Sequence, residues 1–202
     1  MLKMKNKIFN TWDIDKISVS DRGLERYLNL SAAEKHSFSL YANKRFGKKN
    51  YNIIERLAKK MMVTGHIKDS RVHKKISGRD TGKKQTTVKI VKNAFKEIEA
   101  KTKQNPVQVL VQAVENTAPS EETTRIRHGG IIVHKAVDVA PQRRIDVSLS
   151  FISHGAAQRA FKSKTSISKG LAAEIIAASN NDNKTYSVSK KEESERVAAS
   201  AR

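Results

Sequence analysis

A Gly-Gly pair at positions 129 and 130 separates two runs of alternating polar and apolar residues, Glu121 to His128 and Ile131 to Asp138. Glycine reaches positive φ without a Cβ clash, so this pair predicts a two-residue turn and an antiparallel β-hairpin. The hairpin is nearly the only clear β signal in a chain whose other patterns are helical. The fold must therefore consist of helices arranged around one β-ribbon.

The turn also fixes the register of the two strands. If His128 lies opposite Ile131, alternation places Arg125 and Arg127 on one face, with His134 opposite Arg125. The other face then carries three apolar residues, Ile126, Ile131 and Val133. A lone hairpin is marginal in water, so we expect the helical body to cover this apolar face.

The remaining apolar residues recur three and four positions apart in six segments, which is the spacing of amphipathic helices. Asn105 and Pro106 suit a helix cap and first turn, and the segment after them is apolar almost all round, which predicts the centre of the core. The expected helices are about Asn52 to Val63, Thr86 to Lys101, Pro106 to Thr117, Pro141 to Phe161, Ser166 to Ser179 and Ser189 to Ala201.

Two details qualify this pattern. Gly155 weakens the fourth helix by about 1 kcal/mol relative to Ala, and Ser189 with Glu192 has the spacing of a capping box that would open the last helix. The predicted fold class is mainly α, a bundle of about six helices with one protruding β-hairpin.

The chain divides by composition into two regions. Residues 1–49 are basic and mostly irregular, and we expect an N-terminal arm that Trp12, Ile14 and Ile17 dock onto the body. Residues 50–202 form the helical body, with the hairpin at about 121–139. Within the body, Gly65 to Gln85 holds seven Lys or Arg and three Gly, which predicts a long, mobile connector that tracks nucleic acid.

The charge of the chain indicates a polyanionic partner. Lys and Arg number 40 against 20 Asp and Glu, a formal net charge of +20 over 202 residues. Charge of this size repels itself in the folded state, and its commonest partner is a nucleic acid. An anionic membrane is the second candidate, but no apolar run approaches the roughly 18 residues of a membrane span. The basic start of the chain lacks the apolar stretch of a secretory signal.

The low aromatic content narrows how a nucleic acid would be bound. Aromatic residues make up only 5% of the chain. That disfavours recognition by base stacking on a sheet and favours Lys and Arg contacts to phosphates.

Motifs for catalysis are absent from the sequence. The chain has no cysteine, which excludes disulfides, thiolate zinc sites and thiol nucleophiles and favours an intracellular location. No two histidines have the HxxxH or HExxH spacing, and neither a P-loop nor a GxSxG elbow occurs. We therefore expect no metal, no cofactor and no enzymatic activity. Asp138 and Asp146 are expected to pair with Arg143 and Arg144.

Two basic clusters are candidates for phosphate contacts. Asn43 to Lys49 carries four basic residues in seven around a glycine, with Phe46 either anchoring the loop or touching a base. Arg143 and Arg144 lie in the first turn of an expected helix, where the helix dipole disfavours cations, and a nearby phosphate would repair that misfit. Together with Arg125 and Arg127 they are expected to form one basic strip.

The sequence also resembles a known family. The run NPVQVLV from Asn105, with AVEN from Ala113, TRI from Thr124 and Gly129-Gly130, is similar to the S-seven family of small-subunit ribosomal proteins. The run AVDVAPQRR from Ala136 is similar to the same family. So are KRFGK from Lys44 and IERL from Ile54, upstream, and AAEIIAA from Ala172 and KEESERVA from Lys191, downstream. The N-terminal part and the C-terminal tail resemble the archaeal and eukaryotic branch, which includes the eukaryotic small-subunit protein S-five.

This resemblance implies a helical body with a protruding hairpin, bound to the head of the small ribosomal subunit. It implies binding to the 3′ major domain of small-subunit rRNA, nucleation of head assembly, contact with neighbouring head proteins, and proximity to exit-site tRNA and mRNA. It also implies a cytoplasmic, ribosome-bound protein. The expected RNA-binding residues are Lys44, Arg45, Lys48, Lys49, Arg56, Lys60, Lys83, Lys84, Arg125, Arg127, His134, Lys135, Arg143 and Arg144.

Two other classes of function are weighed beside this one. A DNA-bending architectural protein also uses a helical body with basic β-arms, although the Gly129-Gly130 tip carries no proline or large apolar wedge to unstack a base step. A metal-dependent nuclease would need convergent carboxylates, and none cluster in this sequence. Competition between folded rRNA and duplex DNA separates the first alternative, and turnover of labelled RNA with magnesium tests the second.

Overall fold

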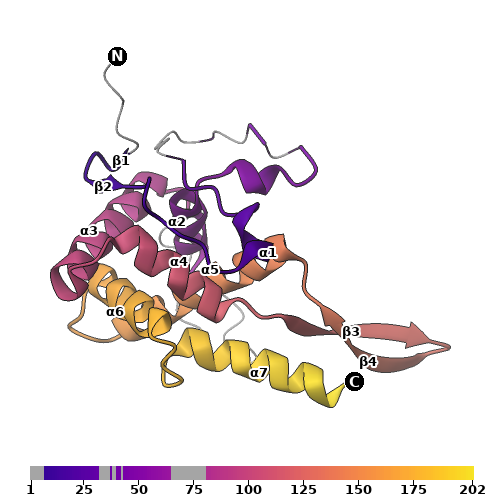
Figure 1. Cartoon of the computed structure of the whole chain (residues 1–202). Helices are drawn as coiled ribbons and strands as arrows, with labels where there is room; N and C mark the ends of the chain where they lie inside the picture. Colours follow the sequence, from indigo (N-terminus) through magenta and orange to yellow (C-terminus); the bar gives the residue numbers. More distant parts are fainter. Residues whose placement is uncertain (1–6, 32–36, 38–39, 42, 65–80) are drawn as a thin grey trace.

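Helices make up the body of the protein, and one β-hairpin extends from it (Figure 1). The computed structural model describes residues 7–31, 37, 40–41, 43–64 and 81–202. The helices in these ranges are α1 (Arg22–Glu25), α2 (Ile53–Val63), α3 (Lys84–Thr102), α4 (Pro106–Thr117), α5 (Pro141–Ala160), α6 (Ile167–Ser179) and α7 (Tyr186–Ser200), with a 3-10 turn, η1, at Gly47–Asn50. The strands are β1 (Lys7–Ile8), β2 (Trp12–Asp13), β3 (Glu121–His128) and β4 (Ile131–Asp138). The predicted fold class is confirmed.

Helix α4 lies at the centre of the core, as its sequence predicts. The Asn105 side chain accepts a hydrogen bond from the Val107 N–H at 3.0 Å, and Pro106 occupies the first turn. Val107, Leu110 and Val114 are fully buried, because α3, α5 and α6 all pack against α4. An apolar surface on every side of a helix requires such enclosure.

The ends of the other helices follow local signals where these exist. Asn52 caps α2 by accepting from the Ile54 N–H at 2.8 Å, and Ser166 caps α6. The predicted capping box of the last helix is wrong, since α7 begins at Tyr186 and the Ser189 N–H donates to the Thr185 carbonyl within it. The earlier start has a tertiary cause: Ser187 and Val188 are buried against the body.

The N-terminal segment packs on the body through aromatic and apolar side chains. Trp12 is buried, its Nε1 donates to Glu99 at 3.0 Å, and its ring centre lies 5.5 Å from that of Phe95. Ile14 and Ile17 are partly buried against the same core, so the predicted docking by these three residues is confirmed. Most of the expected connector, residues 65–80, lies outside the described residues, and its end, Lys84-Gln85, belongs to α3.

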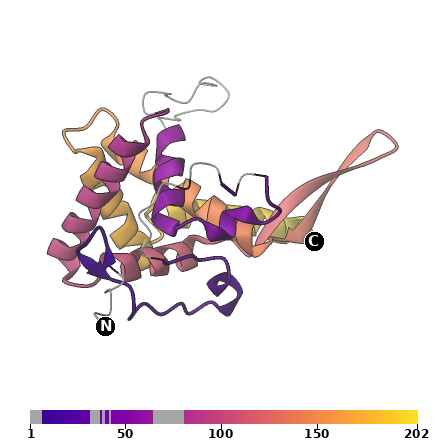
Figure 2. The ribbon, with the colours of Figure 1, turned by 90° about the horizontal axis from the view of Figure 1, so that it is seen from above.

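The hairpin has the predicted register and an unexpected environment. His128 pairs with Ile131 and Arg125 with His134, as the glycine turn requires. However, the ribbon extends away from the helices (Figure 2), and its apolar residues are exposed, with Ile131 69% accessible. The expectation that the body covers the apolar face is therefore wrong.

Among the residues that the structure describes, those at the base of the hairpin contact the body. The Ala136 N–H donates to the Ala201 carbonyl at 3.3 Å, and the Ser120 N–H donates to the Glu195 carboxylate at 2.9 Å. Both acceptors lie on α7 or at its C-terminal end, and α7 lies beside the two strands at this point (Figure 1). These contacts hold the base of the ribbon and leave its outer half in solvent.

Candidate nucleic-acid interface

An open hollow of about 640 Å³ lies where η1, α2, the start of α5 and the base of β3 meet. Its charged lining consists of Lys48, Lys60, Arg143, Glu122 and Asp146. Three of these five are cations drawn from separate parts of the sequence. The fold thus brings together three of the predicted RNA-binding residues.

Asp146 organises one wall of this hollow. Its carboxylate accepts from Lys48 Nζ at 2.8 Å and from Arg56 Nη2 at 3.2 Å. Burial by itself raises the pKa of Asp146, but the hydrogen bond from Lys48 and the charges of Lys48 and Arg56 outweigh it and lower the pKa. Asp146 is therefore ionised at neutral pH and holds two cations in place.

Arg143 has a different partner from the one expected. Its Nε donates to Glu122 Oε2 at 2.7 Å and its Nη2 to Glu122 Oε1 at 3.0 Å, which is a bidentate ion pair. Hydrogen bonds to Glu122 raise the pKa of Arg143. The predicted pairing of Arg143 and Arg144 with Asp138 and Asp146 is wrong, because Glu122 at the base of β3 supplies a carboxylate to Arg143 from another part of the sequence, and Arg144 pairs with Asp21.

Arg56, one of the residues expected to bind RNA, is buried, with only 4% of its side chain accessible. It donates to the Tyr27 carbonyl at 3.1 Å as well as to Asp146. Burial lowers the pKa of Arg56 while Asp146 opposes the shift. A buried guanidinium needs such partners, and here it fixes the position of Asp146.

Lys60 is the least compensated cation of the hollow. It is partly buried, and it forms no ion pair with any residue that the structure describes. Burial lowers the pKa of Lys60, the charges of Lys48, Arg56 and Arg143 lower it further, and Asp146 opposes them. The hollow thus holds more cations than carboxylates, which favours the binding of an external anion.

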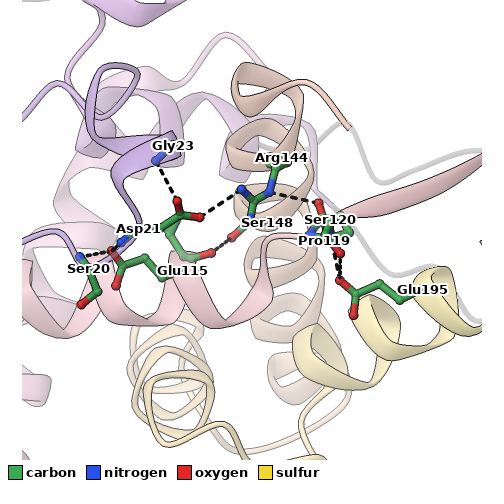
Figure 3. Close-up of polar contacts among 10 residues, drawn as sticks. Ser20, Asp21, Gly23, Glu115, Pro119, Ser120, Arg144, Ser148 and Glu195 are labelled. Carbon is green, nitrogen blue, oxygen red and sulfur yellow. Dashed lines mark hydrogen bonds and ion pairs between the residues drawn. The ribbon is translucent and has the colours of Figure 1, made fainter. Parts of the chain in front are cut away.

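Arg144 turns toward the body and does not join a basic strip (Figure 3). Its Nη1 donates to Asp21 at 3.0 Å and its Nε to the Pro119 carbonyl at 3.2 Å. Asp21 and Ser20 in turn donate their N–H groups to one oxygen of Glu115 on α4. Arg144 therefore links the N-terminal segment, α5 and the base of the hairpin, and the expectation of one strip including it is wrong.

The hairpin carries its cations on both faces. Arg125, Arg127 and His134 share one face by register, together with the exposed Ile132, whereas Lys135 shares the other with Ile126, Ile131 and Val133. Arg125, Arg127, His134 and Lys135 are all exposed. The basic face predicted from the sequence is thus present and open to solvent.

The other predicted residues lie on two segments. Lys44, Arg45, Lys48 and Lys49 are exposed on and before η1. Lys83 is exposed just before α3, but Lys84 forms an ion pair with Glu55. The sequence analysis did not identify Gln142 and Phe151, which also line the hollow. Gln142 is marked in the sequence only by its position before Arg143, and Phe151 only by its position in the expected helix.

Within the ranges that the structure describes, no cluster of three His, Cys, Asp or Glu side chains is arranged to hold a metal ion. The helices described there also include none with the length and apolarity to cross a bilayer.

Comparison with known proteins matches residues 30–202 to the family model described as ribosomal protein S7p/S5e. The chain is similar to the small ribosomal subunit protein uS7 of Methanosphaera stadtmanae, with 48% identity over 98% of this chain and 100% of that one. It is equally similar, at 48% identity over 98% and 100%, to uS7 of Picrophilus torridus, and at 45% identity over 97% and 88% to that of Haloarcula marismortui.

Proposed function

The chain belongs to the ribosomal protein S7p/S5e family, and from this premise we propose that it is a structural, rRNA-binding constituent of the small ribosomal subunit. Membership of this family makes it a structural protein and not an enzyme. The relatives it resembles are named as proteins of that subunit. A cytoplasmic, ribosome-bound location follows from the proposed role.

The observation that carries the proposal is the basic face of the projecting hairpin. Arg125 and Arg127 lie side by side on a ribbon that leaves the body and is exposed along its outer half. A net charge of +20 gives the whole chain affinity for polyanions. The hairpin gives that charge a shape that reaches into a folded RNA.

The finer assignment concerns the place in the subunit. We infer that the RNA partner is the 3′ major domain of small-subunit rRNA, that binding nucleates head assembly, and that neighbouring head proteins, exit-site tRNA and mRNA lie close by. The two-sided hairpin supports this inference, because its basic face suits RNA and its exposed apolar face suits a further neighbour. Residues 1–49 act in this proposal as an arm that the Arg144 network fastens to the body.

The proposed RNA contacts are the exposed members of the predicted set, together with Lys60 in the hollow. Arg56 serves to position Asp146, and Arg144 and Lys84 hold internal ion pairs. The contact residues are Lys44, Arg45, Lys48, Lys49, Lys60, Lys83, Arg125, Arg127, His134, Lys135 and Arg143.

Charge reversal on the hairpin tests the proposal. A protein that makes 6–10 phosphate contacts loses roughly 10³–10⁵ in affinity between 50 and 200 mM salt, so variants must be compared at matched salt. We expect Arg125→Glu with Arg127→Glu to abolish binding of a 3′ major domain transcript in filter assays. The far-UV circular dichroism should stay unchanged, because the two side chains contact solvent.

The matched control is Lys162→Glu with Lys164→Glu, which changes the charge equally in the exposed loop between α5 and α6. It should retain most of the affinity. Equal loss in both double variants, or binding that persists in the hairpin variant, would show that the hairpin is not the binding arm. Competition with duplex DNA in the same assay tests the DNA-bending alternative.

A further inference from the structure

We propose that the hollow beside Phe46 receives one unstacked RNA nucleotide, with its base against the Phe46 ring and its phosphate at Lys60. The inference rests on the proposed function and adds to it a site for a single unpaired nucleotide. The hollow lies at the inner edge of the proposed interface, between η1 and the start of α5.

Phe46 supplies an exposed aromatic ring whose described cation contact is with its neighbour Arg45, 5.0 Å from the ring centre. Half of the residue, 50%, is accessible, although it lies at the edge of a hollow. Its backbone has φ of 56°, a left-handed conformation that is strained for a bulky side chain. Strain of this kind persists where the surrounding structure imposes it and gathers at binding sites.

The loop that presents Phe46 is tightly built. A Cβ at Gly47 would overlap the carbonyl oxygen of Tyr41, so only glycine permits this approach. The Tyr41 and Tyr51 rings pack edge to face, with centres 5.6 Å apart. The backbone next to Phe46 is therefore fixed beside the hollow, which limits the entropy lost when a base stacks on the ring.

Cations lie where the phosphate of such a nucleotide would fall. Lys48, Lys60 and Arg143 line the same hollow as Phe46. Lys48 and Arg143 are already paired with carboxylates, whereas Lys60 has no ion pair among the described residues. An incoming phosphate supplies the charge that Lys60 lacks.

Size and polarity agree with a nucleotide. A hollow of about 640 Å³ is within the range of roughly 300–1,000 Å³ for small-molecule sites. Gln142 lines it, and the Oε1 of Gln142 is buried without a hydrogen-bond partner among the described residues. Because that oxygen is closed to solvent, the Gln142 side chain must turn toward the hollow before its amide can bond the edge of a base. A base in a duplex is paired and stacked on both sides, so only an unpaired one can enter.

The test uses tryptophan as a stacking reporter in the full chain. Phe46→Trp places an indole at the hollow, and Phe161→Trp is the matched control, because Phe161 is 43% accessible and also has a cation near its ring. The native Trp12 is buried and contributes equally to both. We expect the 3′ major domain transcript to quench Phe46→Trp emission and to leave Phe161→Trp unchanged, while a fully paired RNA duplex quenches neither.

If tryptophan is not tolerated at these positions, a second pair of variants is compared by its affinity for the transcript. Because stacking of a base on an aromatic ring contributes to affinity, Phe46→Leu should weaken transcript binding about tenfold or more. Phe161→Leu should weaken it less than twofold. Unchanged Phe46→Trp emission with bound transcript, equal quenching by the duplex, or equal affinities of the two leucine variants would overturn the nucleotide site and leave rRNA binding intact. Failure of the native chain to bind the transcript would instead defeat the proposed function, and the site with it.

Discussion

Gly155 and Glu174 meet at the crossing of α5 and α6, deep in the body. Glu174 is fully buried, and its carboxylate accepts from the Ser187 N–H at 3.0 Å and from Arg159 Nε at 2.7 Å. A Cβ at Gly155 would lie 2.5 Å from the Glu174 carboxyl carbon. Gly155 lowers the intrinsic stability of α5, but the close packing of α5 against Glu174 requires a glycine at this position.

Gly155→Ala should lower the free energy of unfolding, although alanine favours the helix by about 1 kcal/mol. The added methyl group displaces a buried carboxylate that joins three helices, so we expect a net loss of about 1–3 kcal/mol in urea unfolding. Gln158→Ala, at an exposed position of the same helix, should change the value by less than about 0.5 kcal/mol. A Gly155→Ala variant as stable as the native chain would contradict this packing.

At the scale of elements, Glu55 on α2 holds the start of α3. Its carboxylate forms ion pairs with Lys84 and with Lys59, and it accepts from the Ser37 hydroxyl at 2.6 Å. Burial by itself raises the pKa of Glu55, but the hydrogen bonds from Lys84 and Ser37 and the charge of Lys59 outweigh it and lower the pKa to about 2. The ionised form is thus favoured by folding.

Stability should therefore fall in acid through this residue. Because the folded pKa lies below the ordinary value of 4.5, the contribution is complete above pH 4.5 and is lost as the pH falls toward 2. The difference corresponds to on the order of 3 kcal/mol. Glu55→Gln should flatten the pH dependence of urea unfolding between pH 5 and about 2, whereas Glu192→Gln, exposed on α7, should not. Identical profiles for the native and Glu55→Gln chains would disprove the role of Glu55.

The elements also show how far sequence reasoning reaches. The hairpin register, α4 and the cap at Asn105 depend on residues within a few positions of one another, and all are found as predicted. The start of α7 depends on burial of Ser187 beside Glu174, thirteen residues away, and local capping rules misplace it. Local patterns therefore predict where most elements lie.

The candidate site required more than local patterns. Its basic residues stand out in the sequence, but their partners come from distant segments: Asp146 joins Arg56 across 90 positions, and Arg144 joins Asp21 across 123. Such pairs decide which cations remain free for RNA. The bare apolar face of the hairpin was missed for the same reason, because the sequence does not say what will cover a face.

At the scale of the whole molecule, the structure separates a stable body from an exposed binding surface. The described residues of the body form an apolar core to which the N-terminal segment also contributes. The hairpin, η1 and the hollow carry the exposed cations. A chain of net charge +20 with such an unsupported ribbon is best explained by a large anionic partner that completes its surroundings.

The most direct test of this account is the sedimentation of the protein in lysate of the cells that produce it. In a sucrose gradient, the account predicts that the chain migrates with the small ribosomal subunit and remains there at moderate salt. The Arg125→Glu, Arg127→Glu variant should shift to the top of the gradient, while the Lys162→Glu, Lys164→Glu control stays with the subunit. Native protein found only at the top of the gradient, free of the subunit, would contradict the central claim.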